Sequence, residues 1–107
     1  MTEKRALSSV MMTHVVGLHA RPSVKLTKLA KTFASRIELA MAEEGPWIDA
    51  KSIVKVMAAK AARDTVLYFR AEGEDADRSV DALVALVARD FDEAHAEAPG
   101  TERAGAA

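Results

Sequence analysis

Segments with two different hydrophobic periods succeed one another along the chain, and this succession limits the fold more than any other feature. The strand-like segments, in which apolar residues alternate with polar ones or follow a turn, are residues 7–13, 37–41, 47–48 and 65–72. The helix-like segments, in which apolar residues recur every three or four positions, are residues 22–33, 52–59 and 75–91. The predicted order of elements is therefore β-α-β-β-α-β-α.

The predicted strands have one apolar and one polar face, as in a sheet that is covered on one side only. We therefore predict an α+β fold of two layers, a four-stranded antiparallel sheet with three helices on one face. The length of 107 residues fits a single domain, which we place at residues 1–93. Residues 94–107 are dominated by Ala, Gly, Glu and Pro, and this composition predicts a mobile tail.

The composition excludes several kinds of site. Because the chain has no cysteine, it can form no disulfide, no thiolate nucleophile and no cysteine-ligated metal site. No apolar run approaches the roughly 20 residues of a membrane-spanning helix. The charged first residues are not followed by the apolar segment of an export signal. We therefore expect a cytoplasmic protein that makes no membrane contact.

Charged residues are distributed unevenly, although the net charge is only −1. Residues 21–60 contain eight basic and four acidic side chains, whereas residues 71–103 contain three basic and ten acidic ones. This asymmetry predicts a surface that attracts an anionic partner, unless both segments are ordinary solvated helix faces. The basic segment has few aromatic residues, so we expect no nucleic-acid partner.

The clearest chemical signal is a histidine between a turn and the start of a helix, in the segment Gly17-Leu18-His19-Ala20-Arg21-Pro22-Ser23. A proline suits the first helical position, and the first N–H groups of a helix favour an anion. Neutral imidazole is nucleophilic near pH 7, and the N–P bond that it forms is labile enough to pass phosphate on. Although most histidines are ordinary surface or core residues, His19 is here a candidate phosphate acceptor, with Arg21 as its cationic partner. The residues predicted to form a phosphate-stabilising turn around it are Gly17, Ala20, Pro22 and Ser23.

This segment resembles the active-site signature of HPr, the histidine-containing phosphocarrier family of the bacterial phosphoenolpyruvate-dependent phosphotransferase system. The resemblance continues at residues 49–57, which are similar to the family's regulatory-serine segment, and at residues 70–76, which are similar to its last strand and turn. Together these motifs extend over residues 7–92. The resemblance implies an open-faced β-sandwich, which agrees with the two layers predicted from the hydrophobic pattern.

The resemblance also implies a phosphoryl carrier rather than an enzyme, serving sugar uptake or a regulatory branch. Nδ1 of His19 would accept a phosphoryl group from enzyme I and pass it to an enzyme IIA-type acceptor, with Arg21 helping to hold it. Ser52 matches a serine that an HPr kinase/phosphorylase modifies in some members, although a helix N-cap explains it equally well. The residues that match the family's docking patch are Lys28, Lys31, Lys51, Ile53, Val54, Lys55 and Met57.

The chain departs from the family pattern at several positions. Lys60 and Asp64 stand where the family usually has glycine, so Lys60 is predicted to adopt the helix-ending conformation that glycine adopts at little cost. The loop at residues 43–47 is longer than usual, and Trp47 in it is either a lid residue or an anchor at the sheet edge.

Other functions remain open at this point. One is a regulator with the HPr fold that binds partners without passing phosphate, and another is the phosphoryl donor of a dihydroxyacetone kinase. A hydrolase built on Ser52, His19 and Asp49 would lack a nucleophile elbow. A metal site at His14 and His19 would lack a third ligand. We therefore expect a monomer with no metal and no cofactor.

Overall fold

The computed structural model describes residues 4–92, and its elements follow the predicted order. The strands are β1 (Arg5–Met11), β2 (Arg36–Ala40), β3 (Ile48–Asp49) and β4 (Val66–Glu72). The helices are α1 (Ala20–Ala30), α2 (Ile53–Ala59) and α3 (Ala76–Ala88), followed by a 3-10 turn, η1 (Asp90–Asp92). The predicted tail of residues 94–107 lies outside the described residues.

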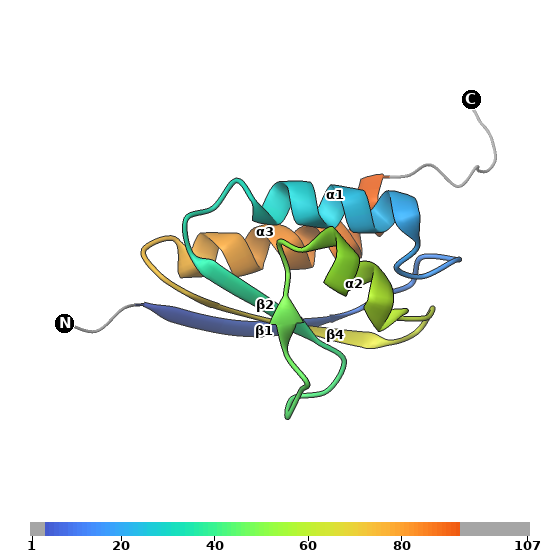
Figure 1. Cartoon of the computed structure of the whole chain (residues 1–107), viewed down its shortest axis with the longest axis horizontal. Coiled ribbons are helices and arrows are strands. Elements are labelled where there is room, and N and C mark those ends of the chain that lie inside the picture. The colour runs from blue at the N-terminus through green and yellow to red at the C-terminus, as the bar shows by residue number, and fades with distance from the viewer. Residues whose placement is uncertain (1–3, 93–107) are drawn as a thin grey trace.

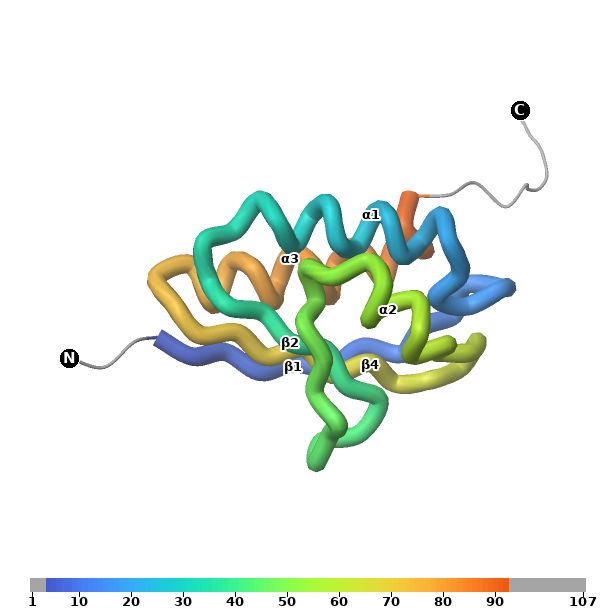
Figure 2. Tube along the Cα trace, in the orientation of Figure 1, coloured from blue at the N-terminus to red at the C-terminus, as the bar shows by residue number. Residues whose placement is uncertain are grey.

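The four strands form one antiparallel sheet in the order β1-β4-β2-β3. β4 lies inside the sheet and pairs with every residue of β1 on one side and every residue of β2 on the other. The three helices lie along one side of the sheet, and the opposite side carries none (Figures 1 and 2). The prediction of an open-faced, two-layer α+β fold is confirmed.

The core lies between the sheet and the helices, and it follows the alternation of the sequence. In β4, Leu67, Phe69 and Ala71 are buried, while the residues between them are more exposed. Leu26 of α1 and Leu83 of α3 are fully buried against this layer. Burying an apolar side chain of this size contributes about 1.5–3 kcal/mol, so this layer is the main source of stability.

Two expectations from the sequence are wrong in detail. Met41, expected on the buried face of a strand, follows the end of β2 and is 44% exposed. Phe91, expected on the last helix, is buried but belongs to η1, where its backbone is left-handed (φ 59°, ψ 27°). A right-handed helix needs negative φ, so α3 ends before Phe91 although the apolar spacing continues to it.

Asp75 joins the start of α3 to the start of β2. Its carboxylate accepts the N–H groups of Ala34 and Ser35, both at 2.9 Å, and also the Ser35 hydroxyl. The side chain is therefore not used to cap α3, although Asp75 is the N-cap residue. The hydrogen bond from the Ser35 hydroxyl, followed by that from the Ala34 N–H, stabilises the ionised form and lowers the pKa of Asp75 to about 2.

Asp75→Asn is expected to destabilise the fold at neutral pH and to lose this effect in acid. The carboxylate stabilises the native state above its ordinary pKa of 3.8, and the contribution disappears as the pH falls toward about 2. The free energies of unfolding in urea of wild type and variant should therefore converge between about pH 6 and about pH 2. Asp77→Asn is the control, because Asp77 is exposed in the first turn of α3 and makes none of these bonds. A difference for Asp75→Asn that stayed constant with pH would contradict the assignment.

α2 ends at a lysine in the left-handed conformation. Lys60 has φ 51° and ψ 42°, and Asp64 in the following loop has φ 69°. The prediction for Lys60 is confirmed, since its backbone adopts the left-handed conformation that favours glycine. This conformation costs a residue with a Cβ atom about 1–2 kcal/mol.

Lys60→Gly is therefore expected to raise the free energy of unfolding by about 0.5–1 kcal/mol, because glycine removes the left-handed cost but gains freedom in the unfolded chain. Ala58→Gly is the matched control, since Ala58 is exposed inside α2, and it should lower the free energy by about 1 kcal/mol. Urea unfolding of both variants measures these values. A loss of stability in Lys60→Gly would be the contrary result.

Candidate functional site

His19 is the N-cap residue of α1, and it is exposed. Its backbone is extended (φ −89°, ψ −171°), and its carbonyl accepts a hydrogen bond from the Ser23 N–H at 3.0 Å. Side chains at this position often accept N–H groups of the first turn, but the His19 side chain makes no such bond. The imidazole is thus exposed and is not used to stabilise the helix.

Gly17 determines how the chain approaches His19. Its φ of 73° is favoured by glycine, and a Cβ atom at this position would overlap the carbonyl oxygen of Ala61. The same carbonyl accepts the N–H of Leu18 at 2.8 Å, and the Gly17 carbonyl accepts the N–H of His19 at 2.8 Å. Glycine is therefore required both for its backbone conformation and for the close packing of the loop against the segment after α2.

The start of α1 offers an anion-binding position beside His19. The helix begins at Ala20, so the N–H groups of Ala20 and Arg21 precede the first helical hydrogen bond. We predicted Pro22 at the first position of the helix, but it is the third residue. Its missing N–H is still tolerated there, because it lies in the first turn. These N–H groups and the helix dipole favour a phosphate at this end.

Ser23 differs from the other residues of the predicted turn. It is fully buried, its N–H donates to the His19 carbonyl, and its Oγ has no hydrogen-bond partner. In the structure Ser23 contributes its N–H to the start of the helix, and the predicted contact with phosphate stays a prediction.

Positive charge accumulates in the first two turns of α1. Arg21 is exposed, Lys25 follows one turn later, and the first turn contains no acidic residue. Nζ of Lys25 donates to the Phe91 carbonyl at 2.8 Å, which holds η1 against the helix. The first turn of α1, which follows His19, therefore carries positive charge, whereas Asp90 and Asp92 of η1 lie near Lys25.

Exposed apolar side chains extend from this end of the molecule over α1 and α2. They come from the loop before His19, from α1 and from α2, which packs beside α1. We refer to the exposed residues of this region as the α1–α2 surface: Val15, Val16, Arg21, Val24, Lys28, Val54, Lys55 and Met57. Val54 is 75% exposed, and several exposed apolar residues on neighbouring elements, unlike a single one, are typical of an interaction site. The sequence analysis did not identify Val15, Val16 and Val24 as surface residues. Val15 and Val16 could have been recognised, because two adjacent valines in a turn fit neither the helical nor the strand period.

Three other residues of the predicted docking patch contribute less. Ile53 is half-buried, and Lys31 is the exposed C-cap residue of α1. Lys51 precedes α2, and its Nζ donates to the Phe33 carbonyl at 2.8 Å. Its ammonium group therefore binds the chain just after α1 and adds little to the α1–α2 surface.

Ser52 is the N-cap residue of α2. Its Oγ accepts the N–H of Lys55 at 3.2 Å, which confirms the capping explanation. Lys51 contacts the chain after α1, whereas Ala61 contacts the loop before α1, so the two helices run in opposite directions. Ser52 therefore lies toward the far end of α1 from His19, at the edge of the α1–α2 surface.

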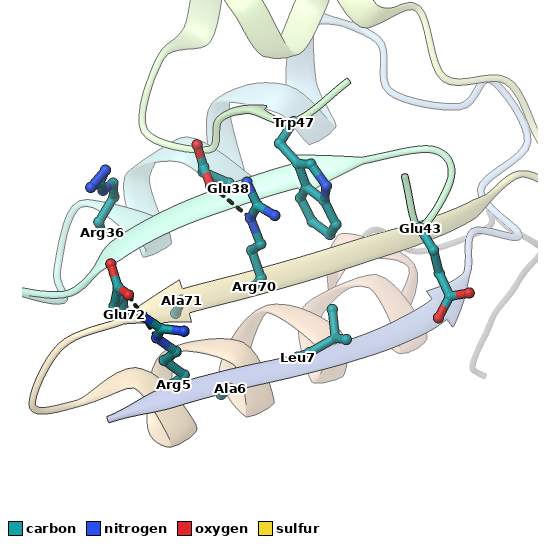
Figure 3. Close-up of a pocket in the computed structure, with 10 residues that line it drawn as sticks. All are labelled: Arg5, Ala6, Leu7, Arg36, Glu38, Glu43, Trp47, Arg70, Ala71 and Glu72. Atoms are coloured by element: carbon teal, nitrogen blue, oxygen red, sulfur yellow. Dashed lines mark hydrogen bonds and ion pairs between the residues drawn. The ribbon is translucent and has the colours of Figure 1, made fainter. Parts of the chain in front are cut away.

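Trp47 lies on the face of the sheet that carries no helices. Its ring is 4.1 Å from the guanidinium carbon of Arg70, and Nε of Arg70 donates to Glu38 at 2.7 Å (Figure 3). The cluster borders a shallow hollow of about 580 Å³ whose wall also includes Leu7 and Glu43. Of the two alternatives for Trp47, the structure favours an anchor at the sheet edge over a lid for His19.

Neither a metal centre nor a membrane span is found in the part of the chain that the structure describes. Among residues 4–92, no three His, Cys, Asp or Glu side chains are grouped so that they could hold a metal ion. None of the helices in this range is both long enough and apolar enough to cross a bilayer.

Comparisons with known proteins point to one family. Residues 8–89 match the family model described as the PTS HPr component phosphorylation site. The phosphocarrier protein HPr of Cupriavidus necator is 42% identical over 78 residues, which are 73% of this chain and 85% of that protein. A multiphosphoryl transfer protein of Haemophilus influenzae is 36% identical over 80% of this chain and 17% of its own length.

The structure is also similar to solved structures of the same family. The crystal structure of HPr from Thermoanaerobacter tengcongensis has a TM-score of 0.75 at 30% identity, covering 82% of this chain and 97% of that one. The matched segment contains β2, β3, β4, all three helices, the His19 turn and most of β1. The chain therefore belongs to the HPr family of the phosphoenolpyruvate-dependent phosphotransferase system.

Proposed function

We propose that this HPr-family protein is a phosphoryl carrier of the phosphotransferase system, with Nδ1 of His19 as the atom that accepts and releases the phosphoryl group. The observation that carries the proposal is the exposed His19 imidazole at the start of α1, which makes no capping bond. The family match supports the carrier role.

The resemblance to the HPr family implies Nδ1, and the shape of the side chain supports it. Nδ1 is bonded to Cγ and therefore lies closer to the main chain than Nε2, which favours contact of a phosphoryl group on Nδ1 with the N–H groups of Ala20 and Arg21. Those groups and the positive end of the helix dipole stabilise its negative charge. The Arg21 guanidinium adds charge-assisted hydrogen bonds from the same turn.

The transfer exchanges one bond to phosphorus for another. The lone pair of neutral Nδ1 attacks the phosphorus of phosphorylated enzyme I; the new N–P bond forms as the donor's bond breaks, and the electron pair stays with the donor. In the second transfer, a nucleophile of an enzyme IIA-type acceptor attacks, and the electron pair of the N–P bond returns to Nδ1. The chain is regenerated after each cycle and is a substrate of its partners, which makes it a carrier rather than an enzyme.

Both partners would dock on the α1–α2 surface, whose valines and cations suit a partner with an apolar patch bordered by acidic residues. An HPr kinase/phosphorylase would act on Ser52 at the edge of this surface. We place the function in residues 1–93 of a cytoplasmic monomer, as the sequence predicts. The absence of a membrane-spanning helix among residues 4–92 is compatible with this location.

The proposal is tested by incubating the full chain with enzyme I and phosphoenolpyruvate, and then with candidate acceptors. We expect acid-labile, base-stable labelling that moves to an enzyme IIA-type protein. Transfer only to the phosphotransfer subunit of a dihydroxyacetone kinase would assign the chain to that pathway instead. A chain that is never labelled would refute the carrier function and favour a regulator that binds without transfer.

Ser52→Asp is expected to slow transfer from enzyme I while leaving the fold intact. The new charge lies beside Lys55 and Val54, where it would repel an acidic partner, and both the association rate and the affinity should fall. Aspartate also caps helices well, so the free energy of unfolding should change by less than about 1 kcal/mol. Ser52→Asn is the matched control, because it caps without adding charge and should transfer at the wild-type rate. Equal rates for all three proteins would mean that Ser52 is only a helix cap.

A further inference from the structure

A second histidine, His14, lies in the loop that leads to His19. It is only 7% exposed. Its Nδ1 accepts the N–H of Val16 at 3.3 Å, and its carbonyl accepts the N–H of Gly17 at 3.1 Å. The side chain and the main chain of one residue therefore close a turn over residues 14–17.

This turn is connected to His19 through the main chain. The Gly17 carbonyl accepts the N–H of His19 at 2.8 Å, and the next residue, Leu18, is fixed by its hydrogen bond to Ala61. Gly17 thus belongs both to the turn at His14 and to the contact with His19, so the geometry of the turn affects how the backbone presents the His19 imidazole. Misplacing a reacting group by about 1 Å can cost about 100-fold in rate.

The His14 ring is also held from its other side. It meets the Phe91 ring edge-on, with centroids 5.7 Å apart and planes at 77°. Phe91 is fully buried, and the Thr13 hydroxyl donates to Asp90 at 3.0 Å, so the loop is tied to η1 at two neighbouring residues. These contacts restrict the ring to the orientation in which Nδ1 faces the Val16 N–H.

We propose that His14 is a positioning residue for phosphoryl transfer: by accepting the Val16 N–H at Nδ1, it sets the loop geometry that presents His19. The inference rests on the proposed function of His19. Asparagine and aspartate make the same turn when their side-chain oxygen accepts the N–H two residues ahead, and His14 supplies a ring nitrogen in that place. The bond requires the neutral tautomer with its proton on Nε2.

Two variants separate the hydrogen bond from the packing. His14→Asn keeps an acceptor close to the position of Nδ1 but loses the ring, whereas His14→Phe keeps a ring against Phe91 and removes the acceptor. With each protein as the substrate of enzyme I, we expect His14→Phe to lose about tenfold or more in kcat. Its KM should change less than its kcat, because only Val15 and Val16 of the α1–α2 surface lie in the altered turn. His14→Asn should stay within about threefold of wild type.

The outcomes distinguish this inference from the proposed function. A wild-type chain that accepts no phosphoryl group would refute the function of His19, whatever the variants do. A labelled wild type with full rates in His14→Phe, or with a larger loss in His14→Asn than in His14→Phe, would refute the positioning role alone. If His14→Phe fails to fold, the hydrogen-exchange rate of the Val16 amide in wild type tests the turn instead. Slow exchange supports the hydrogen bond to His14, whereas exchange at the rate of an unfolded chain overturns the inference.

Discussion

Replacing His19 by alanine is expected to abolish phosphoryl acceptance from enzyme I, the largest effect that any single substitution in this chain should have. The variant lacks the only exposed imidazole that the structure describes, whereas the fold should survive because the His19 side chain makes no capping bond. Losing an N-cap side chain that does cap costs about 1 kcal/mol, so the change in stability should be smaller than that. Labelling with radioactive phosphoenolpyruvate and enzyme I measures acceptance.

The matched controls are the other two histidines. His14→Asn and His95→Ala should both take up one phosphoryl group per chain, even if the rate of the first is somewhat lower. Acid-labile label in His19→Ala would mean that another residue is the acceptor.

Reversing two cations of the α1–α2 surface, Lys28→Glu with Lys55→Glu, is expected to lower the association rate with enzyme I by about tenfold or more at low salt. Both side chains are exposed, one on each helix. A glutamate three residues after the Ser52 cap suits the start of α2, so the fold should be retained. The wild-type and variant rates should converge as salt rises, because exposed charges are screened beyond about 10 Å at 0.1 M salt.

The control for this pair makes the same change of charge elsewhere. Arg36 at the start of β2 and Arg78 in the first turn of α3 are exposed, and both elements begin at the end of the molecule opposite the start of α1 (Figure 1). Arg36→Glu with Arg78→Glu should leave the association rate nearly unchanged. Equal losses from both pairs would show that overall charge matters and that the α1–α2 surface does not. If neither pair of substitutions lowered the association rate, docking would depend on the apolar residues of the α1–α2 surface alone.

The order of elements could be predicted because each depends on a local hydrophobic period. The alternation of Leu67, Phe69 and Ala71 indicates a strand with one buried face whatever its neighbours are, and all three are buried. The order of the strands in the sheet could not be predicted, since β4 pairs with β1 across most of the chain. Phe91 illustrates the same limit, because its spacing predicted burial correctly but not the left-handed turn that contains it.

The candidate site shows a similar division. Gly17, His19 and Pro22 lie within one short segment, so the glycine predicted a turn and the proline predicted a helix start just after the histidine. Contacts between distant segments were not predictable: Lys25 donates to the Phe91 carbonyl, 66 positions away, and Lys51 donates to Phe33. A helical period likewise does not predict which apolar side chains stay exposed. The exposure of Val24 depends on how the neighbouring elements pack, so it is known only from the structure.

The most direct test of the central claim is to locate the phosphoryl group on the intact chain by nuclear magnetic resonance. After reaction with enzyme I and phosphoenolpyruvate, the phosphorus signal and the side-chain nitrogen signals of the histidines identify the bonded atom. We predict one phosphoryl group per chain on Nδ1 of His19, with no phosphorus coupling to the His14 ring. A group on Nε2 of His19 would contradict the role assigned to the start of α1. A group on another residue would contradict the central claim itself.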